Sequence, residues 1–330
     1  MAEEHSRQVH AYWTPERMAA AVPEPMPDRK PSPDPNDSSD QANFSNSRAI
    51  HAYWTPERMA AAQPEPMPDR EPTPDRDDHA CAMAQLQVAG SLKIVPDDNV
   101  KKFPYQSVGK LYYTKVNSSG VKRDSSATAW VANSSSSLHV VFTAAHCLKY
   151  GDEKATNIQF IPGYIPPNTE IFGKYAQIPG GEGVAWAVDP NWDPNKLQAE
   201  YDRGVVHLDK DPNTGKYVDE VVIPIQILAN QKYDSKSEWN TIGYPIASSG
   251  NPSGKMCERS GTFYKMSSSG GSFYKYGVLP GGTSGGPWIM AGSNDSSNGI
   301  QAGNVSQYGC AQSTYFKSTT DELVKLFFSV

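Results

Sequence analysis

Residues 280–288 read Pro-Gly-Gly-Thr-Ser-Gly-Gly-Pro-Trp, so four glycines surround the single serine, Ser284. Glycine tolerates backbone dihedrals that other residues resist, which lets successive N–H groups point into one small cavity. Acyl transfer needs such donors beside the nucleophile, because the tetrahedral intermediate carries a negative oxygen. Taken alone, the stretch also fits a glycine-rich surface loop, so the chemistry depends on partners elsewhere in the chain.

Two earlier stretches supply candidate partners. His146 follows the apolar run 140–142 after a threonine and two alanines, whose small size allows a tight turn at a strand end. A general base needs such a rigid, partly open position. Asp202 lies two residues before the apolar run 204–208. An aspartate there can orient a histidine and stabilise its charged form.

The three candidates occur in the order His146, Asp202, Ser284, separated by 56 and 82 residues. This order differs from those of the α/β-hydrolases and of subtilisin. Asp189 and Asp193 are alternative acids, but neither leads into an apolar run. The sequence therefore favours nucleophilic catalysis by Ser284, with His146 as base and Asp202 as the acid that orients it.

Acidity and proline concentrate at the front of the chain. Residues 1–80 hold 13 of the 27 prolines and carry 15 acidic against 8 basic residues, a net charge of −7, whereas all 330 residues sum to −6. The rest is nearly neutral without a basic run, so we expect no nucleic-acid partner. No stretch approaches the roughly 18 apolar residues of a membrane span, and the first residues lack the features of a secretory signal peptide.

The front segment contains a duplication. Residues 10–34 and 51–75 are identical at 22 of 25 positions. In the second copy Thr55 can cap a helix that starts at Pro56, while Trp54 and Met59 occupy the positions that pack across the cap. The prolines of 64–68 then end the helix. We expect two short helices in an otherwise extended, largely disordered segment over residues 1–90.

From about residue 91, short β-rich runs alternate with Gly, Ser, Asn and Pro turns, which is typical of an all-β barrel or sandwich. The expected strands are 105–113, 128–131, 139–143, 158–161, 204–208, 221–228, 241–244, 261–266, 273–278, 288–290 and 300–305. Thr319 and Glu322 form a capping box before apolar residues at helical spacing. We expect a C-terminal helix over 319–330 that packs its apolar face on the β body through Leu323, Leu326, Phe327 and Val330.

These stretches together carry a family resemblance that covers about residues 100–330. The blocks 143–147, 201–208 and 281–288 resemble the three catalytic blocks of chymotrypsin-like (trypsin-like) serine peptidases. The branch that looks most similar is the secreted bacterial type, which includes the glutamyl endopeptidases, through 103–110, 242–245 and 303–308. The repeated Tyr-Trp-Thr-Pro-Glu-Arg-Met unit resembles a prosegment element of the same enzymes.

The resemblance implies a serine-type endopeptidase that forms an acyl-enzyme. Ser284 would be the nucleophile, His146 the base and then the acid, and Asp202 the residue that orients His146. The backbone N–H groups of Gly282 and Ser284 would form the oxyanion hole. The implied fold has two six-stranded antiparallel β-barrels, at about 100–215 and 216–317, within a peptidase domain over 91–330 that ends in the C-terminal helix.

Two further positions concern substrate binding. Val278 stands where trypsins carry a pocket aspartate, so a preference for Arg or Lys is not implied and the pocket is expected to be apolar. Ser306 matches the family serine that supports the buried aspartate and lines the substrate strand. The histidine associated with glutamyl specificity is missing near 303–308, and Thr283 replaces the aspartate that pairs with a newly cut N-terminus in animal members.

The cysteines depart from the family pattern. Four cysteines lie far apart without a CxxC pair, which argues against a zinc site. Relatives pair the cysteine after the catalytic histidine with an upstream one, but the matching position is Ser125, so Cys147 has no obvious mate. Cys257 and Cys310 are one candidate disulfide pair, but the sequence does not fix the pairing of Cys81, Cys147, Cys257 and Cys310. The implied mechanism needs no metal and no organic cofactor.

The implied partners are protein or peptide substrates, and we expect a monomer at an extracellular location without membrane or nucleic-acid contacts. The front segment has two interpretations: a prosegment that blocks the cleft or assists folding, or a linear motif that recruits another protein. For the whole chain, a catalytically inactive binding protein on the protease fold is the alternative to an active peptidase.

Overall fold

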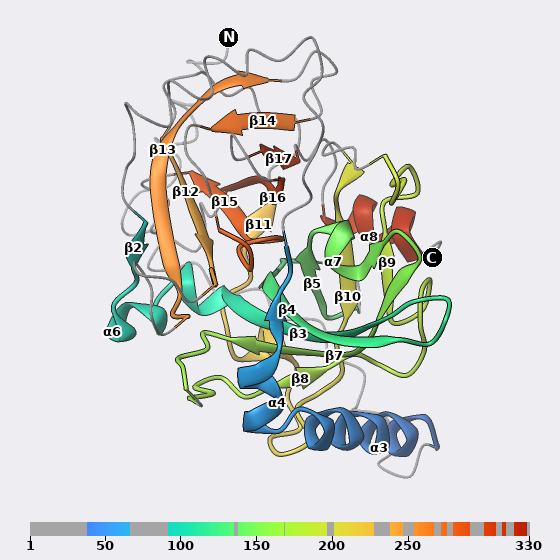
Figure 1. Ribbon diagram of the computed structural model, residues 1–330. Coiled ribbons are helices and arrows are strands. Elements are labelled where there is room, and N and C mark those ends of the chain that lie inside the picture. The colour runs from blue at the N-terminus through green and yellow to red at the C-terminus, as the bar shows by residue number, and fades with distance from the viewer. Residues whose placement is uncertain are drawn as a thin grey trace, which may run out of the picture. The chain divides into compact units, whose positions relative to one another are not determined.

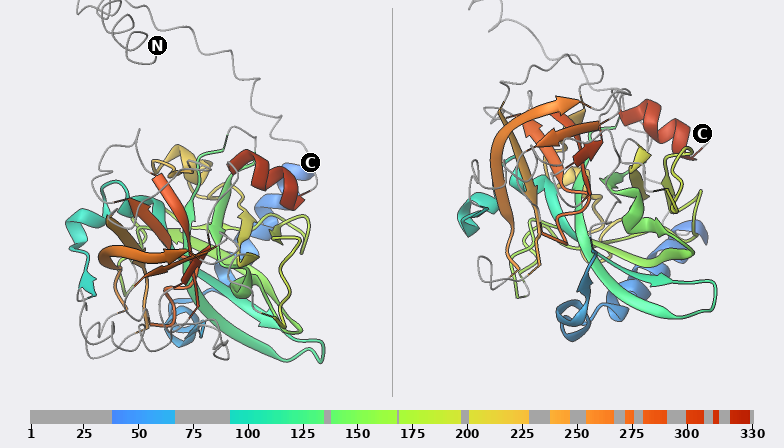
Figure 2. Two further views of the ribbon diagram at one scale, coloured as in Figure 1. Left: turned by 90° about the horizontal axis from the view of Figure 1, so that it is seen from above. Right: turned by 45° about the horizontal axis from the view of Figure 1, so that its top comes forward.

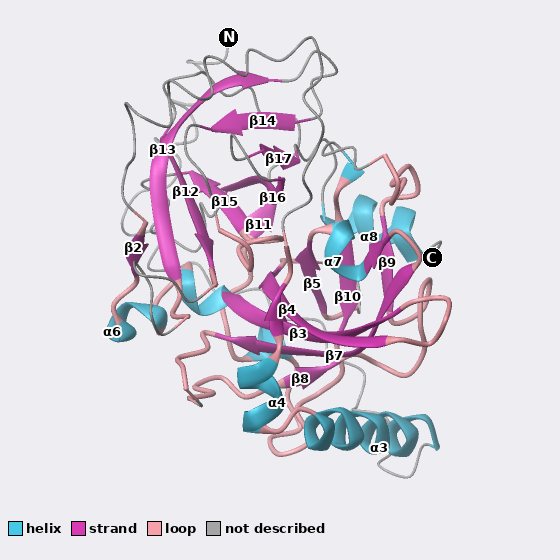
Figure 3. Ribbon diagram, viewed as in Figure 1, coloured by secondary structure: helices cyan, strands magenta, loops and turns pink. Residues whose placement is uncertain are grey.

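A computed structural model describes most of the chain after residue 37. The described residues are 38–66, 92–134, 138–167, 169–196, 201–227, 238–246, 254–266, 272–275, 280–290, 300–307, 312–314 and 320–328. Within them, strands dominate and form two β-sheets (Figure 1 and Figure 3). The expected all-β class is therefore confirmed for the part of the chain that the structure describes.

The first sheet contains the expected runs around His146 and Asp202. Its strand order is β6-β7-β3-β4-β5-β10-β9, with β1 beside β4 and β8 beside β7. The strands are β1 (Gln63–Pro64), β3 (Val108–Val116), β4 (Lys122–Val131), β5 (Val140–Thr143), β6 (Lys149–Tyr150), β7 (Glu153–Pro162), β8 (Tyr175–Ala176), β9 (Trp186–Val188) and β10 (Gly204–His207). Strand β3 pairs antiparallel with both β4 and β7, so it lies in the middle of this sheet.

The second sheet carries the stretch with Ser284. Its order is β11-β16-β15-β12-β13-β14-β17, with β2 beside β13. The strands are β2 (Lys93–Ile94), β11 (Gln226–Ile227), β12 (Glu238–Gly243), β13 (Cys257–Met266), β14 (Ser272–Lys275), β15 (Pro287–Met290), β16 (Ile300–Gln307) and β17 (Gln312–Thr314). Strand β2 lies between β1 and β3 of the first sheet in sequence, but it pairs with β13 of the second sheet.

Two of the expected strands differ in the structure. The run expected from residue 105 begins as a 3₁₀-helix, η1 (Tyr105–Ser107), and only then becomes β3. The run expected over 221–228 is a strand only at β11, after a second 3₁₀-helix, η3 (Val218–Glu220). Pro224 lies inside that run, and proline has no N–H to donate to a neighbouring strand.

The helices are short except at the two ends of the described chain. They are α3 (Ser38–Tyr53), α4 (Pro56–Ala61), α6 (Asp97–Val100), α7 (Ala145–Leu148) and α8 (Thr320–Phe328). Among the described residues, none of these helices is both long enough and apolar enough to cross a membrane.

The C-terminal helix α8 packs as expected against the first sheet. Leu323 and Val324 are buried, and the Phe328 ring lies 6.4 Å from the ring of His207 in β10. Figure 2 shows α8 beside this sheet in both views. Thr319, Val330 and the side chains of Leu326 and Phe327 lie outside what the structure describes.

The N-terminal segment is folded over residues 38–66. Helix α4 begins as the sequence predicts, with the Thr55 hydroxyl accepting the Arg58 N–H at 3.3 Å and with Trp54 and Met59 buried. The expectation of extended chain before the second repeat is wrong for α3, which Figure 1 shows beside β7 and β8. This helix is stabilised by tertiary packing, because Ile50 joins the hydrophobic core while α3 has little apolar periodicity of its own.

Candidate active site

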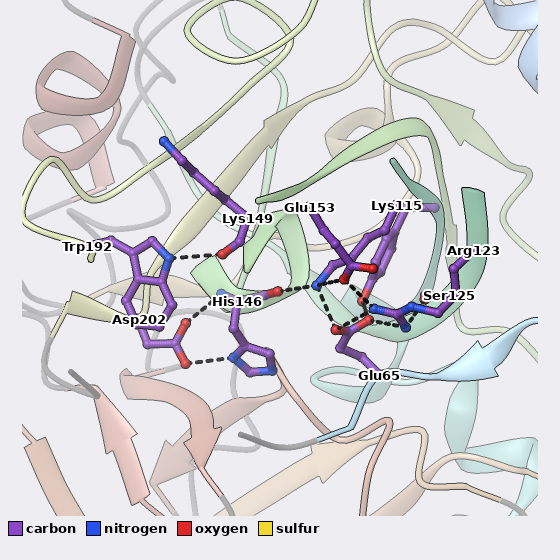
Figure 4. A network of polar contacts seen from close by, with 10 residues as sticks. Glu65, Lys115, Arg123, Ser125, His146, Lys149, Glu153, Trp192 and Asp202 are labelled. Atoms are coloured by element: carbon purple, nitrogen blue, oxygen red, sulfur yellow. Dashed lines mark hydrogen bonds and ion pairs between the residues drawn. The ribbon is translucent and has the colours of Figure 1, made fainter. Parts of the chain in front are cut away.

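His146 lies in the short helix α7 and is held by Asp202 at two points. One Asp202 oxygen is 2.8 Å from the ring Nδ1, and the other accepts the backbone N–H of His146 at 2.8 Å. Both side chains are fully buried. The two contacts fix the position of the histidine backbone and the rotation of its ring together, as Figure 4 shows.

The pairing of two strands brings these residues together. Gly204 at the start of β10 lies opposite Thr143 at the end of β5, so the chain just before Gly204 runs beside the chain just after Thr143. Gly204 also makes room for α7, because a Cβ there would lie 2.7 Å from the Leu148 side chain and 3.2 Å from the Ala144 carbonyl oxygen. Gly204 is not among the site residues predicted from the sequence. The signal that could have identified it is a glycine two residues after Asp202.

The alternative acids are engaged elsewhere. Asp189 forms an ion pair with Arg203, and Asp193 forms one with Lys196 at 3.1 Å. The structure therefore selects Asp202 as the carboxylate that contacts His146, as the sequence predicts.

The electrostatics of the pair favour a charged imidazole. Burial opposes the charge on His146, but the Asp202 carboxylate and Cys147 outweigh burial and raise the pKa of the imidazole to about 10. An imidazole that gains positive charge when it accepts a proton is stabilised by such a partner. A charged imidazole cannot accept a proton, so His146 could act as a base only in its neutral form, which becomes populated as the pH rises toward this pKa.

The loop that carries Ser284 packs against the chain just before His146. Gly282 and Gly285 have φ values of +87° and +80°, which favour glycine. A Cβ on Gly285 would overlap the Thr143 hydroxyl and lie 2.7 Å from the Ala144 nitrogen. Glycine at 285 is therefore required for this close approach, as the glycine-rich sequence suggests.

Two buried atoms of the candidate triad have no hydrogen-bond partner among the described residues. They are Nε2 of His146 and Oγ of Ser284. Both belong to fully buried residues. Buried polar atoms are usually satisfied, and exceptions are common at sites that act on a ligand.

Thr128 in β4 connects the Ser284 loop to the first sheet by hydrogen bonds. This role is not predicted from the sequence. The Thr128 hydroxyl donates to the Gly282 carbonyl at 2.8 Å and accepts the Tyr244 N–H at 2.9 Å. Its own N–H donates to the Ser284 carbonyl at 3.0 Å. The only signal in the sequence is a hydroxyl residue between Ala127 and Ala129 in a buried strand, which is too common to be diagnostic.

The N-terminal segment reaches this loop. The N–H of Gly282, one of the two expected oxyanion donors, donates to the carbonyl oxygen of Glu65 at 3.1 Å. The N–H of Glu65 donates to the Ser126 carbonyl at 2.7 Å, and β1 pairs parallel with β4 just before it. A peptide carbonyl of the chain itself thus occupies a donor that catalysis would use.

The side chain of Glu65 enters a buried cationic cluster on the first sheet (Figure 4). Its carboxylate accepts hydrogen bonds from Tyr113 at 2.9 Å and Lys115 at 2.7 Å, and Arg123 lies at 3.3 Å. Lys115 also donates to the backbone carbonyl of His146 at 2.7 Å. Burial disfavours the Glu65 carboxylate, but Lys115 and Arg123 outweigh burial and lower its pKa.

The rest of the segment is anchored on the same sheet by specific contacts. The Trp54 indole donates to the Asn157 carbonyl at 2.6 Å, Arg58 pairs with Asp124 at 2.6 Å, and the Ser47 hydroxyl donates to Asp209 at 2.8 Å. The anchoring residue types recur 41 positions earlier in the sequence, as Ser6, Trp13, Arg17 and Glu24. That first copy lies outside the described residues.

Two predicted substrate-binding positions cannot be compared with the structure. Val278 lies outside the described residues, and Ser306 is in β16 but its side chain is not described. Cys147 and Cys257 are both buried free thiols, so the expected disulfide between Cys257 and Cys310 is not formed.

Comparison with known proteins identifies the fold. No protein-family model and no curated protein sequence matches this chain. Among solved structures, protease Anisep from Arthrobacter nicotinovorans matches 64% of this chain and 90% of its own at 21% identity and a TM-score of 0.50. A thermostable serine protease, AL20, from an extremophilic microorganism covers 67% of this chain and 93% of its own at 23% identity and a TM-score of 0.49. A Glu endopeptidase in complex with MPD covers 71% of this chain and 94% of its own at 19% identity and a TM-score of 0.49.

The likeness to Anisep confirms the expected fold: this chain has the chymotrypsin-like architecture of two β-barrels.

Proposed function

We propose that this chain is a serine endopeptidase that hydrolyses peptide bonds through Ser284, His146 and Asp202. The observation that carries the proposal is the double contact of Asp202 with His146, at the strand end against which the Ser284 loop is packed. This arrangement supplies a positioned base and a serine on a glycine-rich turn, which are the parts that acyl transfer needs.

In the proposed mechanism, His146 takes the proton of the Ser284 hydroxyl as the oxygen attacks the peptide carbonyl. The N–H groups of Gly282 and Ser284 bind the negative oxygen of the tetrahedral intermediate. His146 then gives the proton to the leaving amine, and an acyl-enzyme remains. Water repeats the attack with His146 as base, which releases the acid product and restores the Ser284 hydroxyl.

The N-terminal segment acts in this proposal as an inhibitory prosegment rather than as a motif for a second protein. Its Glu65 carbonyl takes the Gly282 N–H, so an oxyanion cannot form there while the segment is docked. Its anchors Ser47, Trp54 and Glu65 are buried against the first sheet, as expected of an intramolecular partner. Removal of the segment after export would then activate the enzyme outside the cell.

The test uses a fluorophosphonate probe on the full chain. We expect slow labelling of the wild type, faster labelling of Glu65→Ala because the segment is loosened, and none of Ser284→Ala. Casein hydrolysis should follow the same order, and mass spectrometry of the active form should show that residues 42–66 have been cleaved away. A Glu65→Ala chain that folds but neither labels nor cleaves casein would favour the alternative, an inactive binding protein on this fold.

A further inference from the structure

The cluster around Glu65 is built to receive a carboxylate. Glu65 is 1% exposed, and its two oxygens are met by a phenol, an ammonium and a guanidinium from adjacent strands β3 and β4. Lys115 is 0% exposed, which is rare for a lysine unless it is paired. The donors therefore belong to the barrel itself, whereas the acceptor comes from the N-terminal segment.

The charges in the cluster balance only while Glu65 is present. Lys115 and Arg123 contribute two positive charges. Glu153 contributes one negative charge, at 2.8 Å from Arg123 and 3.9 Å from Lys115. Glu65 contributes the other, so the cluster without it has a net charge of +1. Because Lys115 and Arg123 have then each lost an anionic partner, the vacated site favours another anion.

The site also adjoins the reacting centre. The backbone carbonyl of Glu65 accepts the Gly282 N–H, while its side-chain carboxylate lies in the cluster. One residue therefore reaches both the expected oxyanion donor and the cluster. Lys115 connects the site to His146 by donating to its backbone carbonyl. An acidic side chain held in this cluster would therefore belong to a residue next to the bond that is cleaved.

We propose that Tyr113, Lys115 and Arg123 form a carboxylate-binding subsite, which Glu65 fills in the full chain and an acidic side chain of the substrate fills once the segment leaves. This inference rests on the proposed peptidase function and deepens it. It places selectivity for acidic peptides on the first barrel, away from Val278 and Ser306. The same pocket then serves both inhibition and substrate choice.

Binding can be tested without catalysis in the full chain. Glu65→Ala removes the carboxylate and leaves a cavity. The probe is propionate, which has the same carboxylate group as the end of a glutamate side chain. We expect a saturable rise in Tm of Glu65→Ala with propionate but not with propionamide. The wild type and the double variant Glu65→Ala/Lys115→Met should not respond. If the double variant fails to fold, Glu65→Ala/Tyr113→Phe replaces it, with a weakened response. Equal responses to propionate and propionamide would overturn the subsite.

Selectivity is tested with amide-capped peptide pairs that differ only by Glu or Gln at one position on either side of the cleaved bond. In Glu65→Ala we expect kcat/KM to favour Glu by about tenfold or more at one position, because hydrogen bonds to charged groups are the stronger ones. Adding Arg123→Gln should reduce that ratio toward one. Equal rates for Glu and Gln at every position would contradict the proposal.

The two failures can be told apart. A Glu65→Ala chain that binds propionate but does not label at Ser284 refutes the peptidase function and with it a substrate role for the subsite. A chain that labels at Ser284 but ignores propionate and shows no Glu preference refutes the subsite alone.

Discussion

Asp202 contacts His146 through both carboxylate oxygens, one at the ring Nδ1 and one at the backbone N–H, each at 2.8 Å. The ring contact sets the tautomer that leaves Nε2 to face a substrate or a nucleophile. The backbone contact ties the short helix α7 to the strand β10. A single buried carboxylate thus orients the proposed base and holds the helix that carries it.

This pair predicts an unusual titration of His146. Its raised pKa of about 10 means that the imidazole is charged at neutral pH in the docked chain. The resulting stabilisation is complete below pH 6.5 and is lost as the pH rises through about 10. Ring nitrogen shifts in NMR should therefore show a charged His146 at pH 8, and labelling of Ser284 should speed up from pH 7 toward 10.

The matched variant is Asp202→Asn. Burial then opposes the charge with only Cys147 left to favour it, so the pKa of the imidazole should fall well below about 10 and the ring should be neutral at pH 8. We expect labelling to be slower by about 10⁴-fold, because the amide can hold the wrong tautomer. An imidazole that is already neutral at pH 8 in the wild type would contradict the assignment of Asp202.

Acid should loosen the N-terminal segment. Because docking lowers the pKa of Glu65, its contribution is complete above the ordinary value of 4.5 and is lost as the pH falls through the lower docked value. Hydrogen exchange of the Glu65 amide, which bonds to Ser126, should lose protection with a midpoint below pH 4.5.

Two controls accompany this measurement. Glu65→Gln should lack the acid step, because an amide does not titrate, and the Val141 amide in β5 should keep its protection. Loss of protection at Val141 at the same pH would mean that the barrel unfolds, and the Glu65 explanation would then fail.

Trp54 should supply much of the docking energy. Its side chain is 1% exposed, lies 5.5 Å from the Tyr112 ring and donates to Asn157. Trp54→Ala should cost about 3–5 kcal/mol of unfolding free energy. It should also increase labelling of Ser284. Denaturant titration checks the first effect, and Arg48→Ala on the exposed side of α3 is the control that should change neither.

Thr128 should matter for catalysis although it touches no substrate in the proposed mechanism. Thr128→Val keeps the shape but leaves the Gly282 carbonyl and the Tyr244 N–H without their partner, which costs about 1–3 kcal/mol. We expect slower labelling of Ser284 in the Glu65→Ala background, because the turn that holds the oxyanion donors is loosened. Thr128→Ser keeps the hydroxyl and should restore the rate, and equal rates for Val and Ser would argue against this positioning role.

The local features of the site could be predicted because short stretches encode them. The glycines around Ser284 indicate a turn that needs positive φ, and the structure shows it at Gly282 and Gly285. The cap at Thr55 and the packing of Trp54 also depend on neighbours within a few residues. Such contacts are set by backbone preferences that each residue carries by itself.

The cationic cluster could not be predicted in the same way. Lys115 lies in a strand with no unusual local pattern, and its partner Glu65 is 50 residues away in a proline-rich segment. From the sequence alone both residues are expected to be exposed, as most charged residues are. Their burial depends on which distant segment covers them, and a local pattern does not contain that information.

By itself the sequence identified the three candidate blocks, their order and the second repeat's helix start. The packing of distant strands decided the rest: that Thr128 holds the serine loop, and that Glu65 fills a buried site. These outcomes depend on which chain segments lie beside one another, and that is settled by burial of apolar surface and pairing of buried charges over the whole fold.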